Sequence, residues 1–206
     1  MKGDYDVPAA FPASVVAPRG DGISLPRSSR PDRRLAAEVM RSLERVWEPI
    51  FAQAGDDYVA PGLVLVGEPG APEPCTELRS DAVYCDRERT IDLDVSRTGT
   101  DWPYALAHEV GHHVAELRGT SAEAAHEISE HRGFRNDIRV RQELQAECYA
   151  GIWAYAAGLP ARPGAIASGA TPEHGTGQQR ELWFGRGLNT GRPAECDTFA
   201  PRDIDG

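Results

Sequence analysis

The chain has 206 residues, of which 40% are hydrophobic and 26% are charged, and its formal net charge at pH 7 is −10. These values are ordinary for one globular domain with a sizeable core. The acidic balance argues against a nucleic-acid partner, because a phosphate-binding surface needs clustered basic residues. The sequence also lacks a run of about 18 apolar residues, which a membrane span would need.

The first 30 residues are rich in proline, glycine, serine and arginine and show no hydrophobic periodicity. We therefore expect an extended N-terminal arm over residues 1–30 and a single folded domain over residues 31–206. The first 20 residues contain three prolines and two aspartates, so they lack the apolar segment of a signal peptide. Either the chain is a mature or trimmed form, or export, where it occurs, follows another route.

The first half of the domain predicts one helix and three strands. Apolar residues recur at helical spacing over residues 31–55. The stretch PGLVLVG (61–67) indicates a short buried strand, and AVYC (82–85) and TIDLDV (90–95) indicate a hairpin around the charged DRER. Apolar and acidic residues alternate in 90–95, so we expect this strand to have one solvated face and to form an edge of the sheet.

The second half predicts helices. Asp101 can cap a helix that has Pro103 in its first turn and ends near Gly119. A second, interrupted helix is expected over residues 121–157. A Gly/Pro-rich connection over residues 158–175 then leads to a last short helix in GQQRELWFGRG.

The motif HEVGH lies within the helix that begins near Asp101. His108 and His112 are four residues apart, so they project from one face of the helix and can share a metal ion. Glu109 is too far round to bind the same ion but can reach a water bound to it. A zinc ion lowers the pKa of such a water to roughly 7, so a neighbouring carboxylate can take its proton. The alternative is a helix that merely carries surface histidines.

The residues around the motif favour a site packed against a core. Glycine inside a helix destabilises the helix by about 1 kcal/mol relative to alanine. Its presence at position 111 therefore suggests that a neighbouring segment approaches too closely there for a side chain. His113 points away from the histidine pair, and we expect it to be packed or hydrogen-bonded rather than a ligand. An apolar face runs beside the histidines, formed by Leu106, Val110 and Val114.

A third ligand is available in the second helix. Glu143 and Glu147 are also four residues apart and share a face. In gluzincin peptidases the first of two such carboxylates binds zinc and the second orients a ligand histidine through its free ring nitrogen. The resulting His₂Glu site would leave a fourth position open to water. Taken alone, the two glutamates would be read as surface residues.

A hydrolytic site also needs a donor for the oxyanion of the tetrahedral intermediate. Four residues could supply one: His174, Tyr104, Tyr149 or Arg180. We place His174 first because it lies in a glycine-flanked turn, from which a side chain is easily presented to a cleft. The alternative is that His174 caps the helix that follows.

Four cysteines permit three disulfide pairings, and none lies in a Cys-x-x-Cys spacing typical of zinc knuckles. Cys75 and Cys85 flank a short segment and form a natural local pair. Cys148 and Cys196 would then join a helix to the C-terminal tail. The alternative is four buried, reduced thiols.

Four stretches of the sequence resemble the bacterial putative neutral zinc metallopeptidase family, in the family's order, between residue 75 and about residue 199. They are ALAHEVGHHVAEL, NDIRVRQELQAECYAGIWA, HGTGQQRELWFGRG and CDTF. The resemblance implies one catalytic zinc ion held by His108, His112 and Glu143, with Glu109 as general base. It places Glu147 where the family usually has aspartate. It also implies two disulfides and an extracytoplasmic setting, since many members are exported or membrane-anchored.

The sequence departs from the family where the walls of a cleft would lie. DAVYCDRE replaces the family's Gly-Pro-Phe-Tyr-Cys-Pro stretch, and Glu173 replaces the threonine usual before His-Gly. The segment GLPARPGAIASGATPE is shorter than its counterpart, which would make the cleft compact. We expect no counterpart of the family's N-terminal membrane anchor within these residues. Substrate preference is therefore the property most affected by these differences.

These observations predict an α+β, zincin-like metallopeptidase domain over residues 31–206. A small, mostly antiparallel sheet would pack on the HExxH helix, with the glutamate helix behind it and residues 90–95 as the edge strand beside the cleft. The expected partner is a peptide or protein substrate, with zinc as cofactor and Glu109 activating the water. Two alternatives are hydrolysis of a small amide in a biosynthetic pathway and a catalytically degenerate zinc-binding module. The sequence carries no indication of the oligomeric state.

Overall fold

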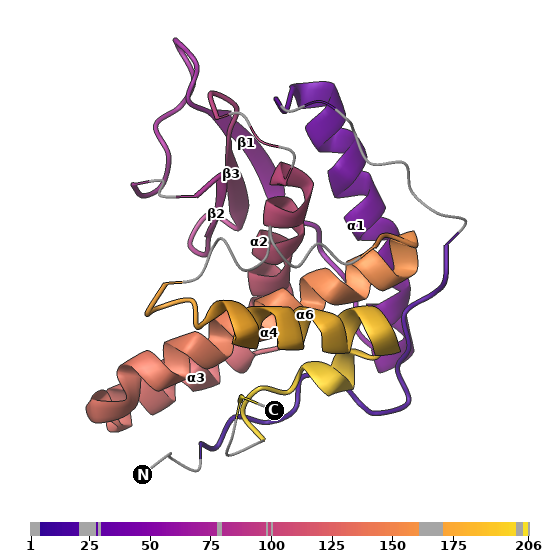
Figure 1. The fold of residues 1–206 in the computed structure, drawn as a ribbon, viewed down its shortest axis with the longest axis vertical. Helices are drawn as coiled ribbons and strands as arrows, with labels where there is room; N and C mark the ends of the chain where they lie inside the picture. Colours follow the sequence, from indigo (N-terminus) through magenta and orange to yellow (C-terminus); the bar gives the residue numbers. More distant parts are fainter. Residues whose placement is uncertain are drawn as a thin grey trace.

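The computed structural model confirms the α+β class (Figure 1). It describes residues 5–20, 28, 30–77, 80–97, 99, 101–160, 171–200 and 204–205. Within these ranges the elements are α1 (Arg33–Ala54), β1 (Gly62–Val66), β2 (Ala82–Cys85), β3 (Thr90–Asp94), α2 (Trp102–Leu117), α3 (Thr120–Glu130), α4 (Arg135–Ala157) and α6 (Gly177–Thr190). Two 3₁₀ turns, η1 (Arg132–Phe134) and η2 (Pro193–Cys196), accompany them. The interrupted second helix is thus α3 and α4, separated by η1.

The sheet has three strands in the order β1-β3-β2. The predicted hairpin is confirmed, because β2 pairs antiparallel with β3. β1 pairs with the other side of β3 in parallel, so the sheet is mixed and β3 is its central strand. The expectation that residues 90–95 form an edge is therefore wrong. The acidic face of this strand is not solvated either, since Asp92 is buried and accepts a hydrogen bond from the backbone N–H of Cys75 at 2.8 Å.

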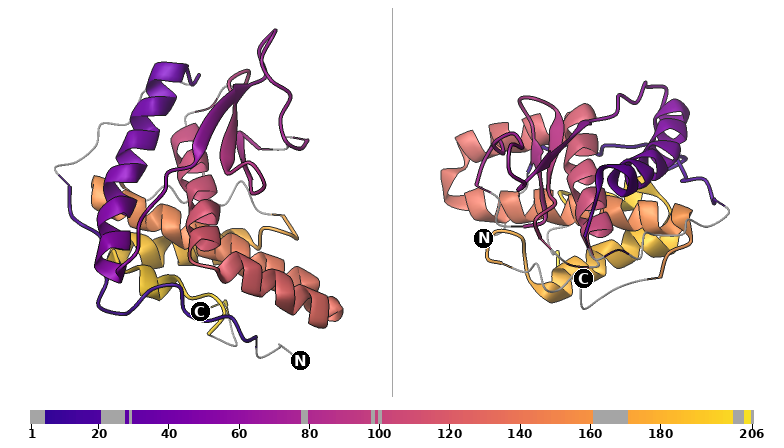
Figure 2. Two further views of the ribbon diagram at one scale, coloured as in Figure 1. Left: turned by 180° about the vertical axis from the view of Figure 1, so that it is seen from behind. Right: turned by 90° about the horizontal axis from the view of Figure 1, so that it is seen from above.

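α2 occupies the centre of the molecule, with the sheet on one side and α1 on the other (Figures 1 and 2). Its apolar face, predicted from the sequence, is fully buried at Leu106, Val110 and Val114. α1 begins where the Asp32 side chain accepts the N–H of Leu35 and ends at Gly55, whose φ of 83° suits glycine. Because α2 is held from both sides, the face that carries the HExxH residues has a fixed direction.

α2 crosses α4 in close contact at Gly111. A Cβ atom at this position would lie 2.7 Å from the backbone oxygen of Ala146, so only glycine fits. The close neighbour expected from the sequence is therefore present. α4 crosses α6 in the same way, because a Cβ on Gly151 or Gly187 would meet the backbone of the other helix. From residue 144 to residue 157, α4 is buried at every position except Tyr155.

The structure contains two disulfides, Cys75–Cys85 and Cys148–Cys196, which are the two pairs expected from the sequence. The described part of the N-terminal arm, residues 5–20, has no helix or strand but inserts Phe11 against Trp47 in the main core. None of the described helices is both long enough and apolar enough to cross a membrane. Most of the connection expected to be shortened, residues 161–170, lies outside the described residues, so the compact cleft inferred from it stays a prediction.

Candidate active site

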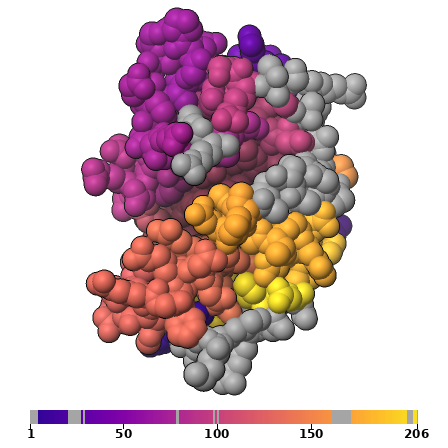
Figure 3. All heavy atoms as spheres, turned by 60° about the vertical axis from the view of Figure 1, so that its left-hand side comes forward, coloured from indigo at the N-terminus to yellow at the C-terminus, as the bar shows by residue number. Residues whose placement is uncertain are grey.

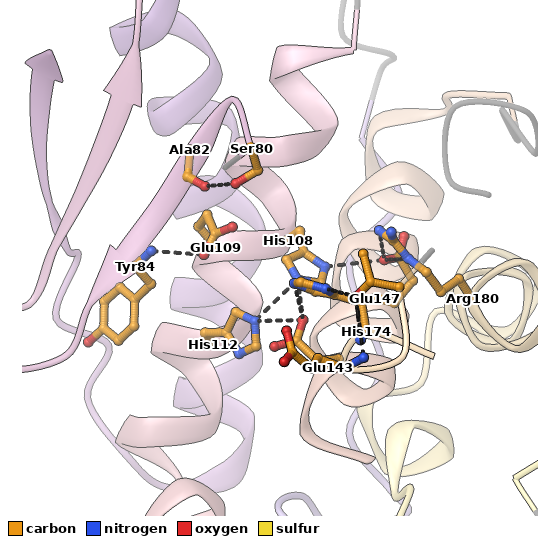
Figure 4. A network of polar contacts seen from close by, with 12 residues as sticks. Ser80, Ala82, Tyr84, His108, Glu109, His112, Glu143, Glu147, His174 and Arg180 are labelled. Carbon is orange, nitrogen blue, oxygen red and sulfur yellow. Dashed lines mark hydrogen bonds and ion pairs between the residues drawn. The ribbon is translucent and has the colours of Figure 1, made fainter. Parts of the chain in front are cut away.

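Three potential metal ligands meet where α2 crosses α4: His108 and His112 from α2, and Glu143 from α4 (Figure 4). Nε2 of His108 lies 3.2 Å from Nε2 of His112 and 3.2 Å from Oε2 of Glu143. Nε2 of His112 lies 3.5 Å from the same Oε2. Atoms that bind zinc tetrahedrally at about 2.0–2.2 Å lie roughly 3.3–3.6 Å from one another. The three donors thus have the chemistry and the spacing of a His₂Glu zinc site.

The charges in this cluster also favour a cation. Burial alone would lower the pKa of His108, but hydrogen bonds with Glu143 and Glu147 raise it to about 10. Burial alone would raise the pKa of Glu143, but His112 and His108 hold it well below its usual range. The carboxylates of Glu143 and Glu147 therefore place negative charge next to the two half-buried imidazole rings. A metal ion can supply the positive charge that a proton supplies in its absence.

Glu147 lies behind His108, on the side of the ring away from Nε2. Its Oε2 is 3.2 Å from Nδ1 of His108, and its side chain is only 5% exposed. Arg180 of α6 donates to the same oxygen from Nη2 at 2.7 Å and from Nε at 3.0 Å. Arg180 was one candidate for the oxyanion donor, but the structure engages it with Glu147 instead. The contact orients His108 so that Nε2 faces His112 and Glu143.

Glu109 lies on the opposite side of the histidine pair from Glu147, against strand β2 (Figure 4). Its Oε2 accepts the backbone N–H of Tyr84 at 2.8 Å. Burial raises the pKa of Glu109, although the positive charge of His108 and His112 acts against that rise. A carboxylate with a raised pKa is a better proton acceptor, which suits a general base. The contact between Glu109 and Tyr84 could not be predicted from the sequence, because 25 residues separate the two.

The Tyr84 side chain continues this contact into a network along β2 and α2. Its hydroxyl donates to Oε2 of Glu116 at 2.7 Å and lies 2.9 Å from Nδ1 of His113. Nε2 of His113 lies 2.7 Å from the backbone oxygen of Val59, and Oε1 of Glu116 accepts from Nε of Arg89 at 2.8 Å. His113 is buried and hydrogen-bonded, as expected from its position on the helix.

His174 is the only one of the four oxyanion candidates that lines the same cleft as the three potential metal ligands. Its Nε2 lies 3.7 Å from Oε2 of Glu143, and its side chain is 42% exposed. Its Nδ1 lies 2.6 Å from the hydroxyl of Thr171. Tyr104 instead donates to the backbone oxygen of Pro160. The remaining candidate, Tyr149, is fully buried among core aromatic rings.

The cluster opens into a cleft of about 890 Å³. The space-filling view in Figure 3 shows this hollow between the strands and their connections above and α3 and α4 below. β2 and the turn after it form one wall, α2 forms the floor, and α3, α4 and the His174 turn form the other wall. Since β3 is central, β2 is the edge strand that faces the cleft.

Residues 14–169 and 168–199 match the family model described as putative neutral zinc metallopeptidase. The uncharacterized protein YpfJ of Escherichia coli strain K12 is 29% identical over 217 residues, which cover 84% of this chain and 75% of the relative. The uncharacterized protein Rv2575 of Mycobacterium tuberculosis strain H37Rv is 31% identical over 212 residues, which cover 79% and 69%. No solved structure gives a significant match.

Proposed function

The chain belongs to the putative neutral zinc metallopeptidase family, and from this we propose that it is a zinc-dependent peptidase that hydrolyses bonds in a peptide or protein substrate. The observation that carries the proposal is the convergence of two imidazole nitrogens and one carboxylate oxygen within 3.2–3.5 Å. A second carboxylate, the half-buried Glu109, lies beside them, and a cleft of about 890 Å³ opens above them.

In this proposal His108, His112 and Glu143 hold one zinc ion. When bound there, zinc polarises a carbonyl group and lowers the pKa of a coordinated water to roughly 7. Oε2 of Glu147 lies 3.2 Å from Nδ1 of His108, close enough to keep the imidazole hydrogen on that nitrogen, so that the lone pair of Nε2 would be free to bind the ion. Arg180 keeps Glu147 ionised and in place through two hydrogen bonds.

Glu109 acts on protons. It takes one from the attacking water and later gives it to the nitrogen of the leaving amine, so the carboxylate returns to its starting state. The backbone N–H of Tyr84 fixes one carboxylate oxygen and leaves the other directed toward the cleft.

His174 is the proposed donor to the oxyanion. The hydroxyl of Thr171 already accepts the backbone N–H groups of Glu173 and His174, so its own proton is available to Nδ1 of His174. That arrangement leaves the hydrogen of the neutral imidazole on Nε2. Nε2–H then faces the cleft, where it can donate to the substrate carbonyl oxygen as negative charge develops.

We also propose an extracytoplasmic location. The two disulfides are the supporting observation, because such bonds persist in oxidising compartments and are rare in the cytosol.

The test measures metal content and peptidase activity on the same proteins. We expect one zinc per wild-type chain by elemental analysis and hydrolysis of denatured casein. Glu143→Ala should lose most of its zinc while keeping its circular-dichroism spectrum, whereas Glu109→Gln should keep zinc and lose activity. Glu130→Ala is the matched control, since this exposed glutamate lies on α3 outside the cleft and should change neither property. Equal zinc in Glu143→Ala and wild type would remove the third ligand and refute the site.

A further inference from the structure

Two arginines line the cleft without an ion pair to any described residue. Arg87 lies in the turn between β2 and β3, and Arg139 lies on α4. Both are exposed. The salt bridges among the described residues include many arginines, but neither of these two. Two unpaired cations in one cleft are notable in a chain with a net charge of −10.

The two arginines lie at the same end of the cleft. Arg139 is one helical turn before Glu143 on α4, in the part of that helix that packs against α3, and it lines the cleft together with Glu116 and Ala122. The turn that carries Arg87 reaches the same place, because its neighbour Arg89 pairs with Glu116 at 2.8 Å. One arginine stands on each wall.

Two of the acidic groups at this end are already engaged. Both oxygens of Glu116 are used, one by Arg89 and the other by the Tyr84 hydroxyl. One oxygen of Asp86 accepts the backbone N–H of Arg87 at 2.7 Å. With Glu88 in the same turn, this end has three arginines and three carboxylates, and Arg87 and Arg139 are the two arginines that line the cleft without an ion pair to a described residue.

The wall between the arginines leaves room for a side chain. Its α3 residues are small: Ser121, Ala122 and Ala125. A guanidinium group above such a space is well suited to a carboxylate, which it can bind through two parallel hydrogen bonds.

We propose that this end of the cleft binds a carboxylate of the substrate, so that the enzyme selects acidic peptides. That the bound carboxylate belongs to a substrate rests on the proposed function, whereas the carboxylate-binding site itself is inferred from the two arginines. The carboxylate comes either from an Asp or Glu side chain or from the C-terminus of the peptide. Replacement by Asn or Gln removes the first, and amidation of the C-terminus removes the second.

The test measures binding without turnover. Zinc-loaded Glu109→Gln protein is titrated into fluorescein-labelled twelve-residue peptides, and the dissociation constant is read by fluorescence anisotropy. One peptide set has an amidated C-terminus and a single Glu moved along the chain. A second set has Gln in place of Glu, and a third has Gln with a free C-terminal carboxylate. We expect the best Glu peptide to bind about tenfold more tightly than its Gln partner, from two arginines at about two- to fivefold each. A preference for the third set instead would assign the site to the peptide C-terminus.

The preference should disappear when Arg87→Gln and Arg139→Gln are combined with Glu109→Gln. Arg135→Gln is the matched control, because Arg135 is one turn earlier on α4, exposed and outside the cleft, and it should keep the preference. Equal binding of Glu, Gln and free-carboxylate peptides, no binding by any of them, or a preference that survives the double substitution would overturn the inference. If wild type hydrolyses no peptide and yet the preference is present, the proposed function fails while the carboxylate site stands.

Discussion

Gly111→Ala is the substitution that tests most directly how the site is assembled. Gly111 sits between the two histidines of the motif, where α2 crosses α4. An added Cβ would lie 2.7 Å from the backbone oxygen of Ala146 and 2.8 Å from its Cα. Both atoms belong to the backbone of a buried helix, so neither can turn aside. The helices must separate, and α4 carries Glu143 and Glu147 with it.

Two effects of opposite sign set the magnitude. Alanine is more favourable than glycine in a helix interior by about 1 kcal/mol. Overpacking in a tight core destabilises by typically 1–3 kcal/mol, and backbone contacts below 3 Å belong at the upper end of that range. The net expectation is a loss of about 1–2 kcal/mol in the free energy of unfolding, which lowers Tm by roughly 2–8 °C for a chain of this length.

The assay is urea denaturation followed by tryptophan fluorescence, together with a competitive chelator titration for zinc. Gly185→Ala on α6 is the control, because the nearest atom to a Cβ there is 3.9 Å away, and it should stabilise by up to about 1 kcal/mol. Zinc affinity should fall in Gly111→Ala and stay unchanged in Gly185→Ala. If Gly111→Ala were as stable as Gly185→Ala, the close crossing would be absent in solution and the reasoning would be refuted.

Three further substitutions follow from the structure. Arg180→Gln should weaken zinc binding about 10- to 100-fold in the same chelator titration, since Glu147 would lose its two hydrogen bonds; unchanged affinity would contradict this role. Replacing both Cys148 and Cys196 by alanine should lower the free energy of unfolding by about 4 kcal/mol in urea denaturation, from the entropy of a 48-residue loop. Tyr84→Phe should lower kcat about tenfold with KM and zinc content unchanged, because the hydroxyl of Tyr84 anchors the strand whose backbone binds the proposed general base Glu109. A change in zinc content without a change in kcat would contradict this role.

Hydrophobic spacing was enough to predict most elements, because burial decides which face of each helix is apolar. It failed at the strand order. β1 and β3 are far apart in the sequence, and their parallel pairing leaves no local sign. The alternating acids of β3 suggested a solvated face, but Asp92 is buried where it holds the backbone of Cys75. A polar residue with a backbone partner is indistinguishable, in a sequence, from one that faces water.

The candidate site shows the same division. Spacing of four residues placed His108 with His112, and Glu143 with Glu147, because helix geometry alone fixes those pairs. Which residues support them depends on tertiary contacts. The backbone amide of Tyr84 at Glu109 is such a contact, since every residue except proline carries that donor and no side-chain pattern marks it.

Each disulfide lies next to a residue that contacts a side chain of the candidate site. Cys85 follows Tyr84 on the edge strand, and Cys148 follows Glu147 on the buried helix. Each covalent link is thus one residue from a group that positions a functional side chain. A catalytic group displaced by about 1 Å can lower a rate roughly a hundredfold, so fixing the two walls of the cleft matters for activity as well as for stability. On this argument the Cys75–Cys85 bond stabilises the β2 wall, which contacts the proposed general base Glu109. The Cys148–Cys196 bond stabilises α4, which carries the proposed metal ligand Glu143.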